Sequence, residues 1–99
     1  MNQLDVPQQI INDFCKANGI RRLSFFGSVL RDDFNQNSDI DVLVEFDSSR
    51  RIGFLAMARM EIELTQILGR KVDLRTPAEL SRYFRDDVLK GAQVQYEAA

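Results

Sequence analysis

The sequence contains no histidine and only one cysteine among its 99 residues. Without histidine, the chain cannot supply a Ser-His-Asp triad, a histidine general base or histidine ligands to zinc. A single cysteine excludes both an internal disulfide and a Cys-x-x-Cys metal site. Because Cys15 stands among apolar residues at helical spacing, we expect it to pack in the core rather than to react.

Long apolar runs and an excess of positive charge are also absent. No run approaches the ~18 residues of a membrane span, and the first residues do not resemble a signal peptide, so we expect a soluble cytoplasmic protein that does not bind membranes. A net charge of −2 argues against direct electrostatic binding to nucleic acid. The length predicts one domain over residues 1–99. Residues 1–50 carry five basic and eight acidic side chains, and this acidic first half calls for an explanation.

The first half of the sequence predicts two helices and two strands. Apolar residues recur at helical spacing over about 6–18, and Gly19 supplies a left-handed end to that helix. The apolar and aromatic segment 23–26 is typical of a buried strand, and residues 28–34 favour a short helix. Alternation of apolar and polar residues over 40–46 predicts the clearest strand.

The second half predicts a long helix over about 53–68 and a strand over 71–74. The methionines of the long helix either line a groove for a partner or pack in the core, and we expect core packing at least for its last turns. A capping box at Thr76 predicts a helix over 76–91, and the tail after it offers a short edge strand. This order favours an α+β fold, a small sheet with helices packed on one face.

Three aspartates stand where a folded chain rarely leaves carboxylates without a reason. Asp39 and Asp41 are two apart on a strand, so they share a face about 7 Å apart, and Asp73 in a neighbouring strand can face the same side. Carboxylates so close repel each other, and a divalent cation relieves that repulsion. Ligands that are all oxygen favour Mg²⁺ or Mn²⁺, and two such ions about 3.5–4 Å apart suit displacement at phosphorus. The simpler alternative is a solvated strand entry with an ordinary surface aspartate.

Gly27 and Ser28 stand at the junction between the first strand and the short helix that follows it. Glycine allows a ligand to approach the backbone closely, and a helix N-terminus offers N–H groups to phosphate oxygens. The Ser28 hydroxyl adds a donor, and Arg31 follows one helical turn later. The alternative is a plain tight turn with Ser28 as the N-cap. Beside a carboxylate pair that binds metal, such a phosphate site suits a nucleoside triphosphate.

The spacing of these two motifs carries a family resemblance. Gly27-Ser28, ten intervening residues and then Asp39-Ile40-Asp41 resemble the Gly-Ser-x10-Asp-x-Asp signature of the DNA polymerase beta-like nucleotidyltransferase superfamily. The segment 68–74 resembles the one that carries the third carboxylate of that superfamily. Over nearly its whole length, the chain resembles the minimal nucleotidyltransferases, which are the antitoxins of HEPN toxin–antitoxin pairs.

The resemblance implies a nucleotidyltransferase fold, with a mixed sheet of three to four strands and helices packed on one face. It also implies that Asp39 and Asp41 ligate two Mg²⁺ ions, with Mn²⁺ as an alternative. Asp73 would complete the shell of the catalytic ion and help to deprotonate the acceptor hydroxyl.

The same resemblance implies how the nucleotide is held. Gly27 and Ser28 would hold the β- and γ-phosphates of ATP. Arg31 occupies the position of a family arginine, although Asp32 follows it where relatives commonly have glycine.

The reaction implied by the resemblance is transfer of AMP from ATP, with release of pyrophosphate, to a tyrosine hydroxyl of a cognate HEPN RNase toxin. The chain would then form a hetero-oligomer with that toxin. One alternative is an antitoxin that neutralises the toxin by binding and occlusion, without catalysis. Another alternative is transfer to a small molecule such as an aminoglycoside, which would require additional pocket-forming structure.

Overall fold

The elements follow the order predicted for an α+β chain in the computed structural model of the protein, which describes residues 6–27, 39–47, 52–83 and 85–98. They are α1 (Gln8–Asn18), β1 (Ile20–Phe26), β2 (Ile40–Phe46), α2 (Phe54–Leu68), β3 (Val72–Arg75), the 3-10 turn η2 (Pro77–Glu79), α3 (Arg85–Gly91) and β4 (Gln93–Glu97). The helix predicted over 28–34 lies outside the described residues.

The four strands form one sheet in the order β3-β2-β1-β4. β1 pairs in antiparallel fashion with both β2 and β4, whereas β2 and β3 are parallel. The sheet is therefore mixed, as the resemblance implied. The tail predicted as an edge strand is β4, which takes its place beside β1 although most of the chain separates the two strands in sequence.

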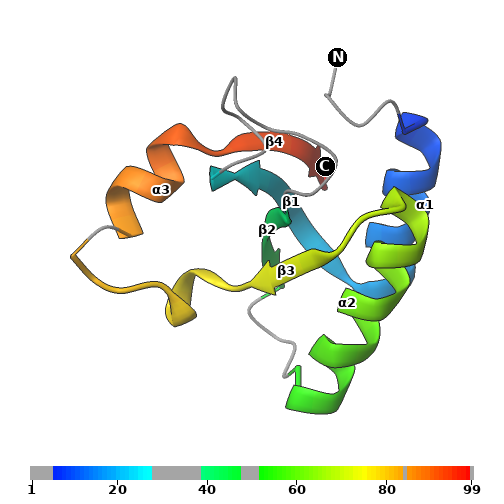
Figure 1. The fold of residues 1–99 in the computed structure, drawn as a ribbon, viewed down its shortest axis with the longest axis horizontal. Coiled ribbons are helices and arrows are strands. Elements are labelled where there is room, and N and C mark those ends of the chain that lie inside the picture. The colour runs from blue at the N-terminus through cyan, green and yellow to red at the C-terminus, as the bar shows by residue number, and fades with distance from the viewer. Residues whose placement is uncertain (1–5, 28–38, 48–51, 84, 99) are drawn as a thin grey trace.

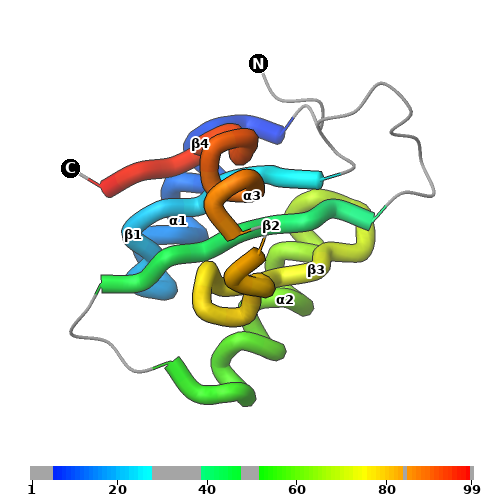
Figure 2. The backbone as a smooth tube through the Cα atoms, turned by 90° about the vertical axis from the view of Figure 1, so that its left-hand side faces the viewer, coloured from blue at the N-terminus to red at the C-terminus, as the bar shows by residue number. Residues whose placement is uncertain are grey.

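The two long helices cover one face of the sheet and form the core with it (Figure 1). Figure 2 shows α3 on the opposite side, in front of the sheet, with α1 and α2 behind it. The buried core joins residues of α1, α2 and all strands except β4: Ile11, Phe14, Cys15, Ile20, Leu23, Phe25, Ile40, Val42, Val44, Met60, Leu64, Leu68, Val72 and Leu74. The alternation over 40–46 therefore predicted correctly which residues of β2 face the helices.

Helix boundaries and the lone cysteine agree with the sequence analysis. α1 and α2 end at Gly19 and Gly69, both with left-handed backbone. Cys15 is fully buried, and its burial raises the pKa of the thiol to about 12, so that the thiol stays neutral. No helix among the described residues has both the length and the apolar composition needed to cross a bilayer.

The continuous helix predicted over 76–91 is wrong. The capping box forms, with Glu79 Oε1 accepting the Thr76 N–H at 3.1 Å, but it opens only the short turn η2. Leu80 is extended, and the Arg85 guanidinium donates to its carbonyl at 2.9 Å. Side chains thus bind backbone groups on both sides of this break in the helix, at Thr76 and at Leu80. No described residue of α3 is buried, so burial of an apolar face does not stabilise a longer helix.

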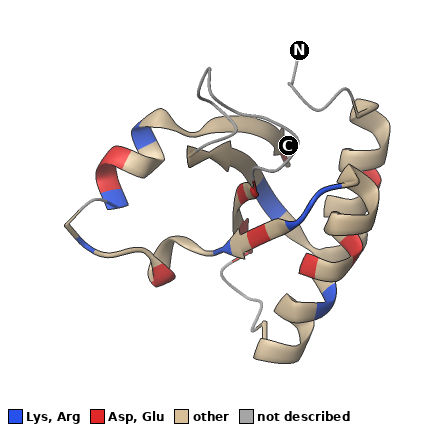
Figure 3. Ribbon diagram, in the orientation of Figure 1, with Lys and Arg blue, Asp and Glu red and all other residues tan. Residues whose placement is uncertain are grey.

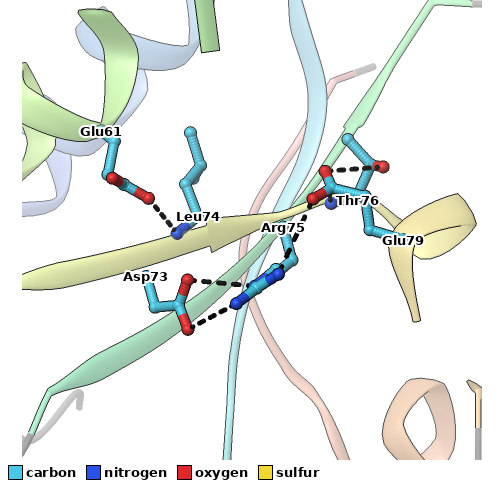
Figure 4. A network of polar contacts seen from close by, with 6 residues as sticks. All are labelled: Glu61, Asp73, Leu74, Arg75, Thr76 and Glu79. Atoms are coloured by element: carbon cyan, nitrogen blue, oxygen red, sulfur yellow. Dashed lines mark hydrogen bonds and ion pairs between the residues drawn. The ribbon is translucent and has the colours of Figure 1, made fainter. Parts of the chain in front are cut away.

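α2 also closes the outer edge of the sheet at β3. The N–H groups of Val72 and Leu74 point away from β2, as the parallel pairing requires. Thr65 Oγ1 accepts the first at 3.2 Å, and Glu61 Oε2 accepts the second at 2.9 Å (Figure 4). An edge strand with unpaired donors invites pairing with another chain, and here side chains of α2 satisfy both donors.

Candidate functional site

Strand register brings two of the three predicted carboxylates, Asp41 and Asp73, side by side. Asp41 of β2 and Asp73 of β3 are cross-strand partners in the parallel pair, and Asp39 directly precedes β2. Residues in register on parallel neighbours share a face of the sheet, which here is the face opposite α1 and α2. Asp39 is exposed, whereas Asp41 and Asp73 are partly buried. The structure thus places Asp73 on a strand beside that of Asp41, as expected, and the roles of the three aspartates as ligands stay a prediction.

Gly27 brings the end of β1 against this cluster. Its φ of +71° lies in the left-handed region, where glycine is favoured. A Cβ at this position would overlap Oδ2 of Asp41 and lie 3.2 Å from its Cγ. The backbone after β1 can therefore approach Asp41 closely only because residue 27 has no side chain. Ser28 and Arg31, the other two residues predicted to bind phosphate, lie outside the described residues.

Arg75 is a residue of the site that the sequence analysis missed. Its Nε lies 3.0 Å from Oδ1 of Asp73 and its Nη2 3.2 Å from Oδ2, while Nη1 lies 3.9 Å from Glu79 Oε2 (Figure 4). The hydrogen bonds to Asp73, followed by the charge of that carboxylate, raise the pKa of Arg75. Residues two apart on a strand share a face, so the spacing of Asp73 and Arg75 was a usable signal.

The donor set fits a divalent cation in its chemistry. Every candidate ligand is a carboxylate, and hard cations such as Mg²⁺ prefer oxygen. In the described ranges, no three acidic or cysteine side chains are arranged so that together they could hold a metal ion. Asp73 forms an ion pair with Arg75, and Figure 3 shows acidic and basic positions close together along β3. A metal ion bound by Asp73 would therefore share this carboxylate with the Arg75 guanidinium or replace the guanidinium there.

The rest of this sheet face differs from the acidic end. Ser24 and Leu43 are cross-strand partners in its middle and are almost fully buried, with 2% and 1% of their surface exposed. Figure 2 shows η2 and α3 in front of this part of the sheet. At the far end, Arg22 forms ion pairs with Glu45 at 3.1 Å and Glu97 at 2.8 Å. The two ends of this face therefore differ in charge balance: one guanidinium bridges both carboxylates at the far end, whereas Asp41 and Asp73 lie in register on adjacent strands at the other.

Comparisons with known proteins place the chain in a family. A family model described as nucleotidyltransferase domain matches residues 7–94. A protein of Methanocaldococcus jannaschii with the provisional name protein adenylyltransferase is 35% identical over 92 residues, 93% of this chain and 96% of that protein. The protein adenylyltransferase MntA of Thermococcus cleftensis is 32% identical over 72 residues, 73% of this chain and 71% of that protein.

Solved structures share the fold. One named provisionally as a minimal nucleotidyltransferase has a TM-score of 0.71 at 33% identity, over 86% of this chain and 85% of the other. A toxin–antitoxin complex with AMP-PNP gives a TM-score of 0.75 at 20% identity, over 94% and 75% of the two chains. A tri-AMPylated Shewanella oneidensis HEPN toxin in complex with MNT antitoxin gives 0.61 at 18% identity, over 92% and 70%. At these lower identities, the last two matches show likeness of fold alone.

Proposed function

From the premise that this chain belongs to the nucleotidyltransferase domain family, we propose that it is an antitoxin that transfers AMP from ATP to a tyrosine hydroxyl of a HEPN toxin. The observation that carries the proposal is the pairing of Asp41 with Asp73 on adjacent strands, with the backbone of Gly27 held against Asp41. The type of reaction and the class of partner are supported by relatives named protein adenylyltransferase and by the structure of an AMPylated HEPN toxin in complex with an MNT antitoxin.

The residues of this chain would divide the work as follows. Asp39 and Asp41 would hold two Mg²⁺ ions, and Asp73 would join them at the ion nearer the acceptor. When bound, these ions supply positive charge at the α-phosphate and at the leaving pyrophosphate. Gly27, with its backbone open to close approach, would border the nucleotide phosphates.

The transfer itself needs one proton acceptor. The acceptor oxygen bonds to the α-phosphorus as the bond from that phosphorus to the bridging oxygen of the β-phosphate breaks, and pyrophosphate leaves. The hydroxyl proton must be removed as the new bond forms, and a positioned carboxylate can take it. Asp73 serves this role in our proposal. Ser28 and Arg31 would bind the β- and γ-phosphates.

The decisive experiment is a double substitution, Asp39→Asn with Asp41→Asn, incubated with Mg-ATP and the HEPN protein encoded beside this chain's gene. We expect the wild type to add AMP to the toxin, as a mass increase on an identified tyrosine, and the variant to add none. Removal of divalent cations with a chelator should abolish the wild-type reaction. AMP addition by the double variant would refute the assignment of the site.

The same experiment distinguishes catalysis from occlusion. A variant that adds no AMP but still neutralises the RNase activity of the toxin would show that binding alone is sufficient. A wild-type chain that adds AMP to no tyrosine, or a genome that has no HEPN reading frame next to this gene, would count against the proposed acceptor.

A further inference from the structure

A groove runs along the outer edge of β3 and reaches the candidate site. It has a volume of about 500 Å³ and lies between the first half of α2 and the segment from β3 to η2. Phe54, Met57 and Ala58 supply its apolar wall, and Asp73 is part of its other wall. A ligand that occupies this groove would therefore contact the residue we propose to accept the hydroxyl proton.

The apolar surface of α2 is divided between the core and this groove. Met60 is buried in the core, whereas Met57 is half-buried and lines the groove. Phe54 also lines the groove but is 86% exposed, so it contributes little to the packing of the chain itself. Leu55 is 77% exposed and does not line the groove. Two neighbouring apolar residues, both largely exposed, thus differ in their relation to the site.

The occupant of the groove must be recognised by its side chains. The outward N–H groups of Val72 and Leu74 already donate to Thr65 and Glu61, so an incoming strand would find both donors taken. Strand addition, which relies on main-chain hydrogen bonds, is therefore disfavoured at this edge. An apolar side chain inserted between Phe54 and Met57 remains compatible with these contacts.

Charge further limits the occupant. Three carboxylates line the groove, those of Glu61, Asp73 and Glu79, against the single guanidinium of Arg75. A segment that carries positive charge beside its apolar side chain complements this surface, whereas an acidic segment would be repelled.

On the basis of the proposed function, we infer that this groove binds the acceptor segment of the partner protein. The occupant is a stretch of that protein with an apolar side chain and a neighbouring basic residue, close in sequence to the hydroxyl that receives AMP. Phe54 is then a residue for recognition of the acceptor, and it takes no part in the chemistry.

The test compares Phe54→Ser with Leu55→Ser, and both variants are measured against the HEPN protein encoded beside this gene. We expect Phe54→Ser to raise the Kd for the partner at least about tenfold, as loss of a buried aromatic contact does. It should raise the KM for the partner similarly, with kcat and the affinity for Mg-ATP unchanged. Leu55→Ser should leave all four quantities at wild-type values. Equal effects of the two variants, or no effect of Phe54→Ser, would overturn the inference.

A second measurement identifies the occupant. A photo-crosslinking amino acid is placed at position 54, and the crosslinked peptide of the partner is identified by mass spectrometry. We expect the peptide that contains the modified hydroxyl or its immediate neighbour in sequence. A crosslink to a distant part of the partner, or to a second copy of this chain, would overturn the inference.

An error in the proposed chemistry and an error in the proposed role of the groove give different results in these experiments. If the wild type binds the partner but transfers no AMP, the proposed chemistry is wrong, whatever the Kd of Phe54→Ser. If the wild type transfers AMP and Phe54→Ser does so with unchanged KM, only the groove is wrong.

Discussion

The two faces of the sheet are built from the same strands but have different roles: one packs in the core, and the other carries the candidate site. On β2, Ile40, Val42 and Val44 point into the core under α1 and α2, and none has any exposed surface. Asp41, one residue away, points to the opposite face and is the cross-strand partner of Asp73. Strand geometry alternates side chains between faces, so adjacent residues can have separate tasks.

From this difference we expect substitutions on the two faces to affect different properties of the protein. Substitutions on the face under the helices should alter the free energy of unfolding and leave the chemistry of folded molecules intact. Substitutions at the acidic end of the other face should do the reverse. A residue whose substitution changes both quantities would mark a place where the two faces are coupled.

The largest effect is expected on the acidic face, from Asp73→Asn. Loss of a general base lowers rates roughly 100- to 10,000-fold, and we expect a loss in this range in the rate of AMP transfer. The thermal midpoint should change little, because the ion pair with Arg75 is exposed at the surface. Asp86→Asn on α3 is the control and should retain the wild-type rate. A wild-type rate in Asp73→Asn would show that another group accepts the proton.

Ile40→Ala is the contrasting substitution on the face covered by the helices. Ile40 lies between Asp39 and Asp41 in the sequence, but its side chain is buried in the core. Truncation of a buried isoleucine leaves a cavity, and we expect the free energy of unfolding to fall by about 2–5 kcal/mol. Urea denaturation measures that loss, and transfer assays below the transition measure kcat of the folded fraction, which should match wild type. The milder Ile40→Val should cost about 0.5–1.5 kcal/mol. A large fall in kcat at unchanged stability would mean that the two faces are not independent.

Gly27→Ala tests the coupling of both faces at the end of β1. A side chain at positive φ costs about 1–2 kcal/mol, and the added Cβ would displace the carboxylate of Asp41. We expect that loss of stability in denaturation and, because misplaced groups react poorly, a fall of roughly 100-fold in transfer rate. Gly53→Ala is the matched control, since its Cβ would meet nothing within 4 Å. Equal behaviour of the two variants would contradict the close approach to Asp41.

The smallest effect concerns Cys15 in the core. Burial raises the pKa of its thiol from the usual 9.0 to about 12, so above pH 9 the unfolded chain loses a proton that the folded chain retains. Stability from this group is therefore complete below pH 9 and declines as the pH rises toward 12. We expect the wild type to lose about 1–2 kcal/mol more than Cys15→Ala between pH 8 and pH 10.5. Parallel pH profiles of unfolding free energy for the two proteins would refute this.

Local patterns were sufficient to predict the parts of the fold that depend on local physics. The alternation over 40–46 predicted β2 and its buried face, and Gly19 and Gly69 marked the ends of both long helices. The expectation that Asp73 can face the same side as Asp41 from a neighbouring strand agrees with the structure, whereas the parallel pairing and its register became known only from the structure.

The remaining features depend on contacts between distant segments or on the absence of packing. The propensity of the segment after Thr76 favoured one helix, but no core lies against α3 to stabilise it, and the chain is extended at Leu80. The groove along β3 exists only because α2 approaches that edge. The methionines of this helix offered a groove as one alternative, but the sequence alone could not tell Met57, which lines the groove, from Met60, which is buried in the core.

The hydrogen bonds from Val72 and Leu74 to side chains of α2 also limit where a further strand could be added to the sheet. An inserted strand needs an edge with donors to offer, and at β3 both outward donors have acceptors on α2. β4 forms the other edge, two strands away from β2 and its carboxylate. A strand added beside β4 would therefore lie away from the acidic end of the sheet, whereas one added beside β3 would have to displace side chains of α2.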